Sequence, residues 1–307
     1  GARAYGEFLG RRYGARGNVI WVMGGDWGPV SDHHDLTHEV NALAGAIAAT
    51  APDQLITGHA NRNDSALDDY PEPWLDLNST YAEPGTVVSE VANDCPPQNP
   101  ILPTFLIEGR YENEGVPARD LRAQMYQAIL GGAQGHLYGA SNVWYFDADS
   151  GERFADDPTD TWQEALEYPG ARSLAALSSL LRVRDLAAMI PDHDGRLLTA
   201  LSGEPSHVPC RLTADQEGAV CYVPRAGALS LDRDRMAAGS LRASWYDPSR
   251  GEIHGSAVVD PRGRVTLSPP GPGDWILLLD RSERELRLPD GRPLAVALES
   301  FSASRDA

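Results

Sequence analysis

Short apolar runs that end in polar residues alternate with helical patterns through residues 1–190, and this alternation most constrains the fold. The first run, 19–23, is apolar on both faces, which is typical of a buried parallel strand. The sequence predicts, in order, strand 19–23, helix 36–49, strands 54–59, 74–78 and 104–108, helix 118–130, strand 135–139 and helix 171–184. Strand–helix alternation of this kind predicts a parallel α/β architecture.

The number of strands leaves two parallel architectures open. A (β/α)8 barrel needs eight strands and about 250 residues, whereas residues 1–190 offer five strands. A barrel would therefore require three further strand–helix units before residue 1, and an open sheet would require none. No glycine-rich dinucleotide loop follows the first strand, which disfavours a Rossmann-type sheet.

The pattern changes near Pro191, where proline and glycine begin to punctuate short alternating strands. Such strands are predicted at 197–201, 219–223, 241–246, 265–267 and 275–279. This spacing is typical of a small antiparallel β-sandwich. We therefore expect a parallel domain at 1–190, a β-sandwich at 191–280 and a C-terminal extension at 281–307 that adds an edge strand or trails off.

The three cysteines are too few for a disulfide scaffold. Cys210 and Cys221 are expected to face each other across a hairpin whose turn lies near Asp215 and Gln216. A disulfide and two buried thiols are both compatible with this placement, and Cys95 would be left unpaired. The cysteines therefore leave the redox compartment open.

The acidic charge of the chain narrows the range of partners. Asp and Glu number 44 against 26 basic residues, all of them Arg, for a net charge of -18. Such a surface repels phosphate groups, which argues against nucleic acid and anionic membranes as partners. The longest apolar runs also fall short of the about 20 residues that a membrane-spanning helix needs.

Polar residues lie at or just after the C-terminal ends of the predicted parallel strands. The active site of a parallel barrel lies at these ends. The residues at these ends are Asp26, His59, Asn78, Glu108 and His136. A carboxylate at the end of an apolar strand is costly unless it is hydrogen-bonded or used. Two carboxylates across one pocket are what glycoside hydrolysis requires, one as acid and one as nucleophile or base. The structural alternatives are that Asp26 caps the next helix and that Glu108 pairs with Arg110.

Polar and aromatic residues near the strand ends are candidates for sugar binding. Glu112 is expected to orient Tyr111 or Arg110 rather than to react. The other polar candidates can both donate to and accept from sugar hydroxyls, and Trp side chains offer faces on which a sugar ring can stack. The candidate substrate-binding residues are Trp27, His59, Asn78, Tyr111, Glu112, His136, Tyr138 and Trp144.

The segment 32–39 resembles a metal cluster, because His34 and His38 are four residues apart, as in a zinc pair on one helix face. The HExxH motif is absent, however, and the acidic residues equally suit a solvated first helical turn. The sequence also has no P-loop, GxSxG elbow or CxxC motif. We therefore expect no metal and no cofactor, and keep a metal-dependent hydrolase as an alternative.

Five segments follow one another in an order that a known family shares: WVMGGD (21–26), LITGH (55–59), WLDLN (74–78), EGRYE (108–112) and GGAQGHLYG (131–139), followed by Trp144. They resemble the apiosidase-like glycoside hydrolases, glycoside hydrolase family 140. The later segments WYDPSRG (245–251) and DWILL (274–278) resemble the small β-sandwich, often labelled collagen-binding, that follows the barrel in such proteins. The resemblance covers residues 1–280.

The resemblance implies a (β/α)8 TIM barrel in which residues 1–190 supply strands four to eight, followed by a small antiparallel β-sandwich. It implies that Asp26 ends strand four as the general acid/base and that Glu108 ends strand seven as the nucleophile. A retaining reaction is the expected outcome of that placement. The family usually has Pro after the strand-seven Glu, where this chain has Gly109, so the turn is expected to be looser.

The resemblance further implies a substrate, a missing part and a location. The substrate would be a plant cell-wall pectic oligo- or polysaccharide that carries a terminal furanosyl, apiose-like residue. The first three barrel units would come from another chain or from a missing N-terminal segment, and an extracellular or periplasmic location is favoured over the cytoplasm. The alternatives are an arabinofuranosidase-type hydrolase and a non-catalytic carbohydrate- or protein-binding protein with a partial barrel.

Overall fold

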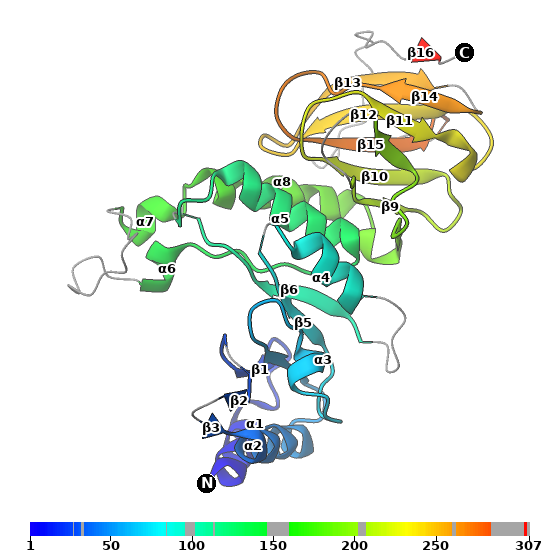
Figure 1. Cartoon of the computed structure of the whole chain (residues 1–307). Coiled ribbons are helices and arrows are strands. Elements are labelled where there is room, and N and C mark those ends of the chain that lie inside the picture. The colour runs from blue at the N-terminus through cyan, green and yellow to red at the C-terminus, as the bar shows by residue number, and fades with distance from the viewer. Residues whose placement is uncertain are drawn as a thin grey trace. The chain divides into compact units, whose positions relative to one another are not determined.

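The computed structural model describes residues 1–26, 28–31, 34–83, 85–95, 102–112, 114–145, 160–201, 207–259, 262–283 and 304–305 (Figure 1). The chain divides into two compact units. The first unit comprises Gly1–Gly109 and Ala133–Leu137, and the second comprises Arg110–Gly132 and Tyr138–Ala307.

The first unit contains the predicted strand–helix alternation. Its helices are α1 (Ala2–Tyr13), α2 (Thr37–Thr50), α3 (Ala66–Asp69) and α4 (Val87–Asp94). Its strands are β1 (Ile20–Gly24), β2 (Val30–Ser31), β3 (His34–Asp35), β4 (Leu55–His59), β5 (Asn78–Tyr81) and β6 (Thr104–Glu108). The strands predicted at 19–23, 54–59 and 104–108 and the helix predicted at 36–49 are therefore confirmed to within one or two residues.

The longer strands run parallel and follow one another in chain order. β1 pairs in parallel with β4, and β5 pairs in parallel with β6. β4 and β5 are linked because the Asp76 and Leu77 amides both donate to the Ile56 carbonyl, at 2.9 and 3.3 Å. On the far side of β6, Leu106 forms a parallel bridge with His136. The strand predicted at 135–139 is thus reduced to one bridge.

The strand predicted at 74–78 is wrong: β5 begins only at Asn78. Trp74 and Leu75 lie before it and are buried in the core of the first unit. The carboxylate of Asp76 accepts a hydrogen bond from the Ile56 amide at 2.9 Å. The apolar residues of this segment therefore pack from a loop, whereas the strand itself, with sequence NSTY, has mostly polar side chains.

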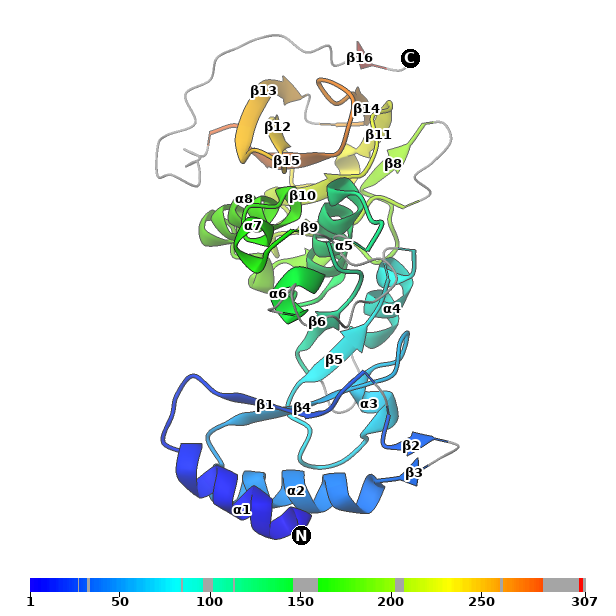
Figure 2. The same ribbon diagram turned by 90° about the vertical axis from the view of Figure 1, so that its left-hand side faces the viewer.

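Helices α1 and α2 lie side by side and pack against β1 and β4 (Figure 2). Their close approach depends on glycines one helical turn apart. A Cβ at Gly6 would clash with the Leu43 carbonyl, and one at Gly10 would clash with the Thr50 side chain. Between these helices and the strands lies an apolar core that includes Met23, Ile47 and Ile56.

Side chains alternate between the two faces of a strand, so Ile20, Val22 and Leu55 lie on the face opposite to Met23 and Ile56, together with Thr57, which is buried. Ile20, Val22 and Leu55 are 55%, 45% and 44% exposed. One face of β1 and β4 is therefore packed against helices, and the other presents apolar side chains to solvent.

The second unit contains two antiparallel sheets and the helices α5 (Ala118–Gly131), α6 (Ser141–Tyr145), α7 (Trp162–Ala165) and α8 (Pro169–Val183). The six-stranded sheet has the order β13-β12-β15-β10-β9-β7 and the four-stranded sheet the order β16-β14-β11-β8. The strands are β7 (Ile190–Pro191), β8 (Leu198–Ala200), β9 (Cys210–Leu212), β10 (Gly218–Val223), β11 (Leu229–Asp232), β12 (Leu241–Asp247), β13 (Glu252–Val259), β14 (Arg264–Leu267), β15 (Trp275–Arg281) and β16 (Ser304–Arg305). The predicted antiparallel sandwich is confirmed, and β16 adds the edge strand expected after residue 280.

The helices α5 and α8 share a buried core with the outer face of the six-stranded sheet. Tyr126 of α5 stacks on Tyr222 of β10 with ring centroids 5.3 Å apart. Two buried carboxylates of the sheet bind arginines on the helix side: Asp274 binds Arg122 at 2.7 Å, and Asp280 binds Arg184 at 2.6 Å. The compact units therefore divide the chain elsewhere than at the expected domain boundary of residue 190.

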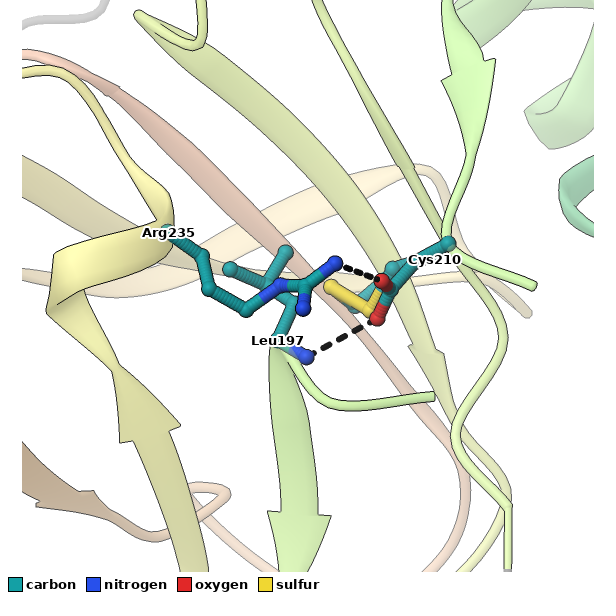
Figure 3. Close-up of a disulfide and its surroundings, with 5 residues drawn as sticks. Leu197, Cys210 and Arg235 are labelled. Atoms are coloured by element: carbon teal, nitrogen blue, oxygen red, sulfur yellow. Dashed lines mark hydrogen bonds and ion pairs between the residues drawn. A yellow bond between two sulfur atoms is a disulfide. The ribbon is translucent and has the colours of Figure 1, made fainter. Parts of the chain in front are cut away.

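Cys210 and Cys221 form a disulfide between neighbouring strands β9 and β10, which resolves the alternative left open by the sequence (Figure 3). Asp192 lies beside it and accepts hydrogen bonds from the Leu197 amide at 2.9 Å and from Arg235 at 3.0 Å. Both cysteines are buried in the sandwich core. Cys95 is not part of a disulfide.

Among the helices that the structure describes, none combines the length and the hydropathy that crossing a membrane would require.

We expect the disulfide to stabilise the second unit. Replacing both Cys210 and Cys221 by Ser should lower the free energy of unfolding by about 2–3 kcal/mol, because the crosslink closes a short loop in the unfolded chain. Chemical denaturation followed by circular dichroism measures this change. Cys95→Ser is the control and should have a much smaller effect. Equal stability of the oxidised and the reduced protein would contradict the prediction.

Candidate active site

The polar residues of the first unit gather where its parallel strands end. His59, Tyr81 and Glu108 are the last residues of β4, β5 and β6, and Asp26 lies two residues beyond β1. Because parallel strands in chain order place their C-terminal ends along one edge, these four residues share that edge. We call Asp26, His59, Tyr81 and Glu108 the strand-end group.

A short contact joins two members of the strand-end group. His59 Nε2 lies 2.7 Å from Glu108 Oε2, and His59 Nδ1 lies 3.1 Å from the Ala60 carbonyl oxygen. Both side chains are largely buried, with 13% and 17% of their surfaces exposed. A doubly protonated imidazolium can donate to both oxygens, so the geometry favours an ion pair.

The electrostatics of His59 agree with this geometry. Burial lowers the pKa of His59, but the hydrogen bond to Glu108, the Ala60 carbonyl and the charges of Glu108 and Asp26 outweigh it and raise the pKa. The charge of Asp26 also contributes to the raised pKa of Tyr81. Asp26 and Glu108 therefore act electrostatically on the same two side chains.

Tyr81 is a member of the strand-end group that the sequence analysis missed. Its ring meets the His59 ring edge-on with centroids 5.5 Å apart, and its hydroxyl accepts a hydrogen bond from Arg62 Nη2 at 3.3 Å. Burial raises the pKa of Tyr81, so the phenol stays protonated near neutral pH. The sequence does predict a strand in this region, but it places the end of that strand at Asn78, three residues before Tyr81.

The same shift of the strand changes the position of Asn78. Asn78 begins β5, at the end of the strand opposite to Tyr81. Its side chain is fully buried, and Oδ1 accepts a hydrogen bond from the Leu67 amide at 2.9 Å. The structure therefore does not bring Asn78 to the strand ends, and the reasoning that placed it there fails.

His136 lies next to β6 through its bridge with Leu106. Both of its ring nitrogens are buried and have no hydrogen-bond partner within the described part of the chain. Burial lowers the pKa of His136 to about 4, so the ring is neutral near pH 7. A neutral imidazole has one donor and one acceptor to offer.

The structure contains neither alternative expected for the two carboxylates, which were a helix cap for Asp26 and an ion pair with Arg110 for Glu108. Helix α2 has Leu36 as its N-cap, so Asp26 does not cap it. Glu108 pairs with His59, and Arg110 pairs with Glu114 at 3.5 Å. The structure is therefore compatible with a chemical role for Asp26 and Glu108.

Glu112 and Tyr138 belong to the second unit and contact each other there. Tyr138 donates its hydroxyl proton to Glu112. The buried carboxylate of Glu112 also accepts from the Gly170 and Ala171 amides, at 2.9 and 3.2 Å, in the first turn of α8. A carboxylate at this position satisfies open amides and interacts favourably with the helix dipole. Glu112 thus stabilises the start of α8.

The three remaining aromatic candidates, Tyr111, Trp144 and Trp27, have different surroundings. Tyr111 packs so closely on Gly139 that a Cβ at that position would overlap its ring. Trp144 lies in α6 and is 64% exposed. Trp27 lies outside the described residues, as do Asp32 and His33 of the histidine-rich segment. Within the described ranges, no three His, Cys, Asp or Glu side chains are placed to hold a metal ion.

Comparison with known proteins gives two family matches that together span most of the chain. Residues 1–188 match the family described as apiosidase-like, catalytic domain. Residues 190–280 match the domain labelled as collagen-binding, from a collagenase. No curated protein sequence gives a significant match.

Solved structures share the fold at low sequence identity. A glycoside hydrolase aligns over 92% of this chain and 69% of its own length, with 22% identity and a TM-score of 0.79. A glycoside hydrolase family 5 protein from Bacteroides vulgatus aligns over 92% of this chain and 66% of its own, with 21% identity and a TM-score of 0.80. This chain thus spans about two thirds of the length of each.

The family match covers more than half of the chain and agrees with the placement of two carboxylates at the ends of parallel strands. The chain therefore belongs to the apiosidase-like family, and its residues 1–188 belong to the catalytic domain of a glycoside hydrolase.

Proposed function

We propose that the protein removes a terminal furanosyl, apiose-like residue from a plant cell-wall pectic glycan by a retaining, two-carboxylate reaction. Glu108 is the nucleophile and Asp26 the general acid/base. The observation that carries this proposal is the 2.7 Å contact between His59 and Glu108, at the strand edge that Asp26 shares. The family match supports the reaction type, and the sequence resemblance supports the sugar.

The contact with His59 suits a nucleophile. Glu108 must be ionised to attack, and a protonated His59 favours the ionised carboxylate. In the first step, Glu108 attacks the anomeric carbon while Asp26 protonates the leaving oxygen. In the second step, Asp26 takes a proton from water, and the water oxygen displaces Glu108 and releases the sugar.

Sugar binding is assigned to the other predicted residues in this proposal. His136 has the strongest support. Its buried ring nitrogens have no hydrogen-bond partner among the described residues, so they can donate to one hydroxyl and accept from another. Tyr81 joins it with a protonated phenol. The other proposed contacts are Trp27 and His59, whereas Asn78 lies buried at the opposite end of β5 and is not a contact in this proposal.

We further propose that three additional strand–helix units complete an eight-stranded barrel. They would come from another polypeptide or from a segment that precedes residue 1. The exposed apolar side chains of β1 and β4 support this, since such a face is normally covered. An arabinofuranosidase-type reaction is the nearest alternative, because the same two carboxylates would serve it.

An extracellular or periplasmic location is part of the proposal. The buried Cys210–Cys221 disulfide supports it, because such bonds form and persist in oxidising compartments. The partner is an oligo- or polysaccharide, and nucleic acid and membranes are not partners in this proposal. The acidic net charge of -18 is consistent with both exclusions.

Glu108→Gln should abolish turnover, since the amide cannot form the glycosyl-enzyme. We expect kcat to fall by a factor on the order of 10⁴, measured as release of reducing sugar from pectic oligosaccharides. Glu7→Gln is the matched control, because Glu7 is a partly exposed carboxylate of α1 that lies outside the strand-end group. A Glu108→Gln protein that keeps most of its activity would contradict the proposed mechanism. Absence of activity in the unaltered protein would favour the non-catalytic carbohydrate- or protein-binding alternative.

Asp26→Ala should slow cleavage according to the leaving group. Substrates with a poor leaving group need the acid, whereas an activated aryl furanoside leaves without protonation. For the aryl furanoside we expect the second step to become limiting and azide to restore turnover by forming a glycosyl azide. Retained configuration in that azide product checks the stereochemistry. A lack of azide rescue together with equal losses on both substrates would contradict the role of Asp26.

The pKa of His59 should fall when Glu108 is replaced by Gln. The raised pKa in the folded protein means that His59 adds stability below its unfolded pKa of about 6.5, and that this stability is lost as pH rises through the folded value. NMR titration of the His59 ring in the unaltered protein and in the variant measures the change. An unchanged His59 titration in Glu108→Gln would exclude the ion pair.

A further inference from the structure

Arg62 lies beside the strand-end group, on the loop that follows β4, and it is held from three directions. Its guanidinium carbon lies 5.6 Å from the centre of the Tyr81 ring, and its Nη2 donates to the Tyr81 hydroxyl at 3.3 Å. Its Nη1 pairs with Glu83 at 3.0 Å. The cation is therefore fixed in place, which is unusual for a surface arginine with its large rotamer freedom.

The loop that carries Arg62 is itself fixed. Asn63 has a φ of 64°, in the left-handed region that few residues other than glycine adopt, so the chain turns immediately after Arg62. The Asn63 amide donates to the Tyr81 carbonyl at 2.8 Å, and the Tyr81 amide donates to the Asp64 carbonyl at 3.2 Å. Asn is one of the few residues besides glycine that adopt this region readily, so Asn63 is suited to this turn.

Despite these contacts, Arg62 remains accessible. Its side chain is 59% exposed, whereas that of Glu83 is 29% exposed. Within the described part of the chain, the Tyr81 hydroxyl accepts from Nη2 and Glu83 pairs with Nη1, so these two contacts involve only part of the exposed guanidinium fork. A planar fork with open donors binds a carboxylate through two parallel hydrogen bonds.

The charge around the site indicates why such a cation is needed. The chain carries a net charge of -18, and Asp26, Glu83 and Glu108 add negative charge near the strand ends. An acidic glycan would be repelled from this region unless a fixed positive charge compensated. Arg62 is close enough to Glu108 for the two charges to interact, since Glu108 contributes to the raised pKa of Arg62.

We propose that Arg62 binds the carboxylate of a uronic acid unit next to the bond that is cleaved, and so selects an acidic glycan over a neutral one. This inference rests on the function proposed above and adds a specificity-determining residue to it. Arg62 takes no part in bond breaking. Its fixed guanidinium positions the acidic unit, while Asp26 and Glu108 act on the neighbouring sugar.

The experiment compares Arg62→Gln with the unaltered protein on two matched substrates. One is a mixture of pectic oligosaccharides, and the other is the same mixture with its carboxyl groups reduced to primary alcohols. We expect Arg62→Gln to lower kcat/KM on the acidic oligosaccharides about ten- to hundredfold and to leave the reduced oligosaccharides unaffected. Arg3→Gln is the matched control, because Arg3 is 81% exposed and pairs with Glu7 at 3.4 Å. It should change neither value.

Two results would overturn the inference. Equal losses on both substrates would mean that Arg62 acts only by holding Tyr81, and no loss on either would mean that it is an ordinary surface arginine. If the unaltered protein cleaves neither substrate, the proposed function fails, and calorimetric binding of the acidic oligosaccharides decides about Arg62 separately. Weaker binding by Arg62→Gln would then support the inference, and equal binding would overturn it.

Discussion

Parallel pairing of strands in chain order is the constraint on which the candidate site depends. The parallel strands β1, β4, β5 and β6 end at the same edge, so residues separated by up to 82 positions, Asp26 to Glu108, reach one place. The helices α1 and α2 secure one face of this sheet through a close, glycine-based contact. The candidate site therefore consists of single residues at the end of each parallel strand or, for Asp26, just beyond it.

The sequence predicted the strands whose apolar runs are continuous, and it failed where burial and strand structure separate. Runs such as 19–23 and 104–108 do form strands, although Ile20 and Val22 are exposed, and the ends of these strands lie close to Asp26 and at Glu108. Trp74 and Leu75 are buried without being in a strand, and this moved the predicted strand end from Tyr81 to Asn78. An apolar run in the sequence indicates that a segment packs against the rest of the protein. Whether that segment is a strand or a loop depends on hydrogen bonds to a neighbouring strand.

The sequence also could not predict which residues far apart in the chain contact each other. Nothing next to His59 in the chain indicates that Glu108, 49 residues away, is its partner. The role of Glu112 at the first turn of α8 likewise depends on a contact across 58 residues. For Cys210 and Cys221 the hairpin gave the right register, but their bonding state needed the structure.

The site places two kinds of positive charge in a strongly acidic protein. His59 is largely buried and bound to Glu108, so its charge is tied to the protonation state of that carboxylate. Arg62 is exposed and permanently charged, so its field does not change with pH in the physiological range. One cation is suited to tuning the charge of the Glu108 carboxylate and the other to meeting a ligand from solvent.

The packing of α5 and α8 on the six-stranded sheet has a consequence for how the protein can be divided. The family boundary lies between residues 188 and 190, yet Tyr126, Arg122 and Arg184 on the N-terminal side are buried against the sheet on the other. A cut at that boundary would expose an apolar face and leave the buried carboxylates Asp274 and Asp280 without their cations. The sandwich and the helices α5 and α8 therefore belong to one compact unit, and modular exchange of the sandwich would have to carry those helices with it.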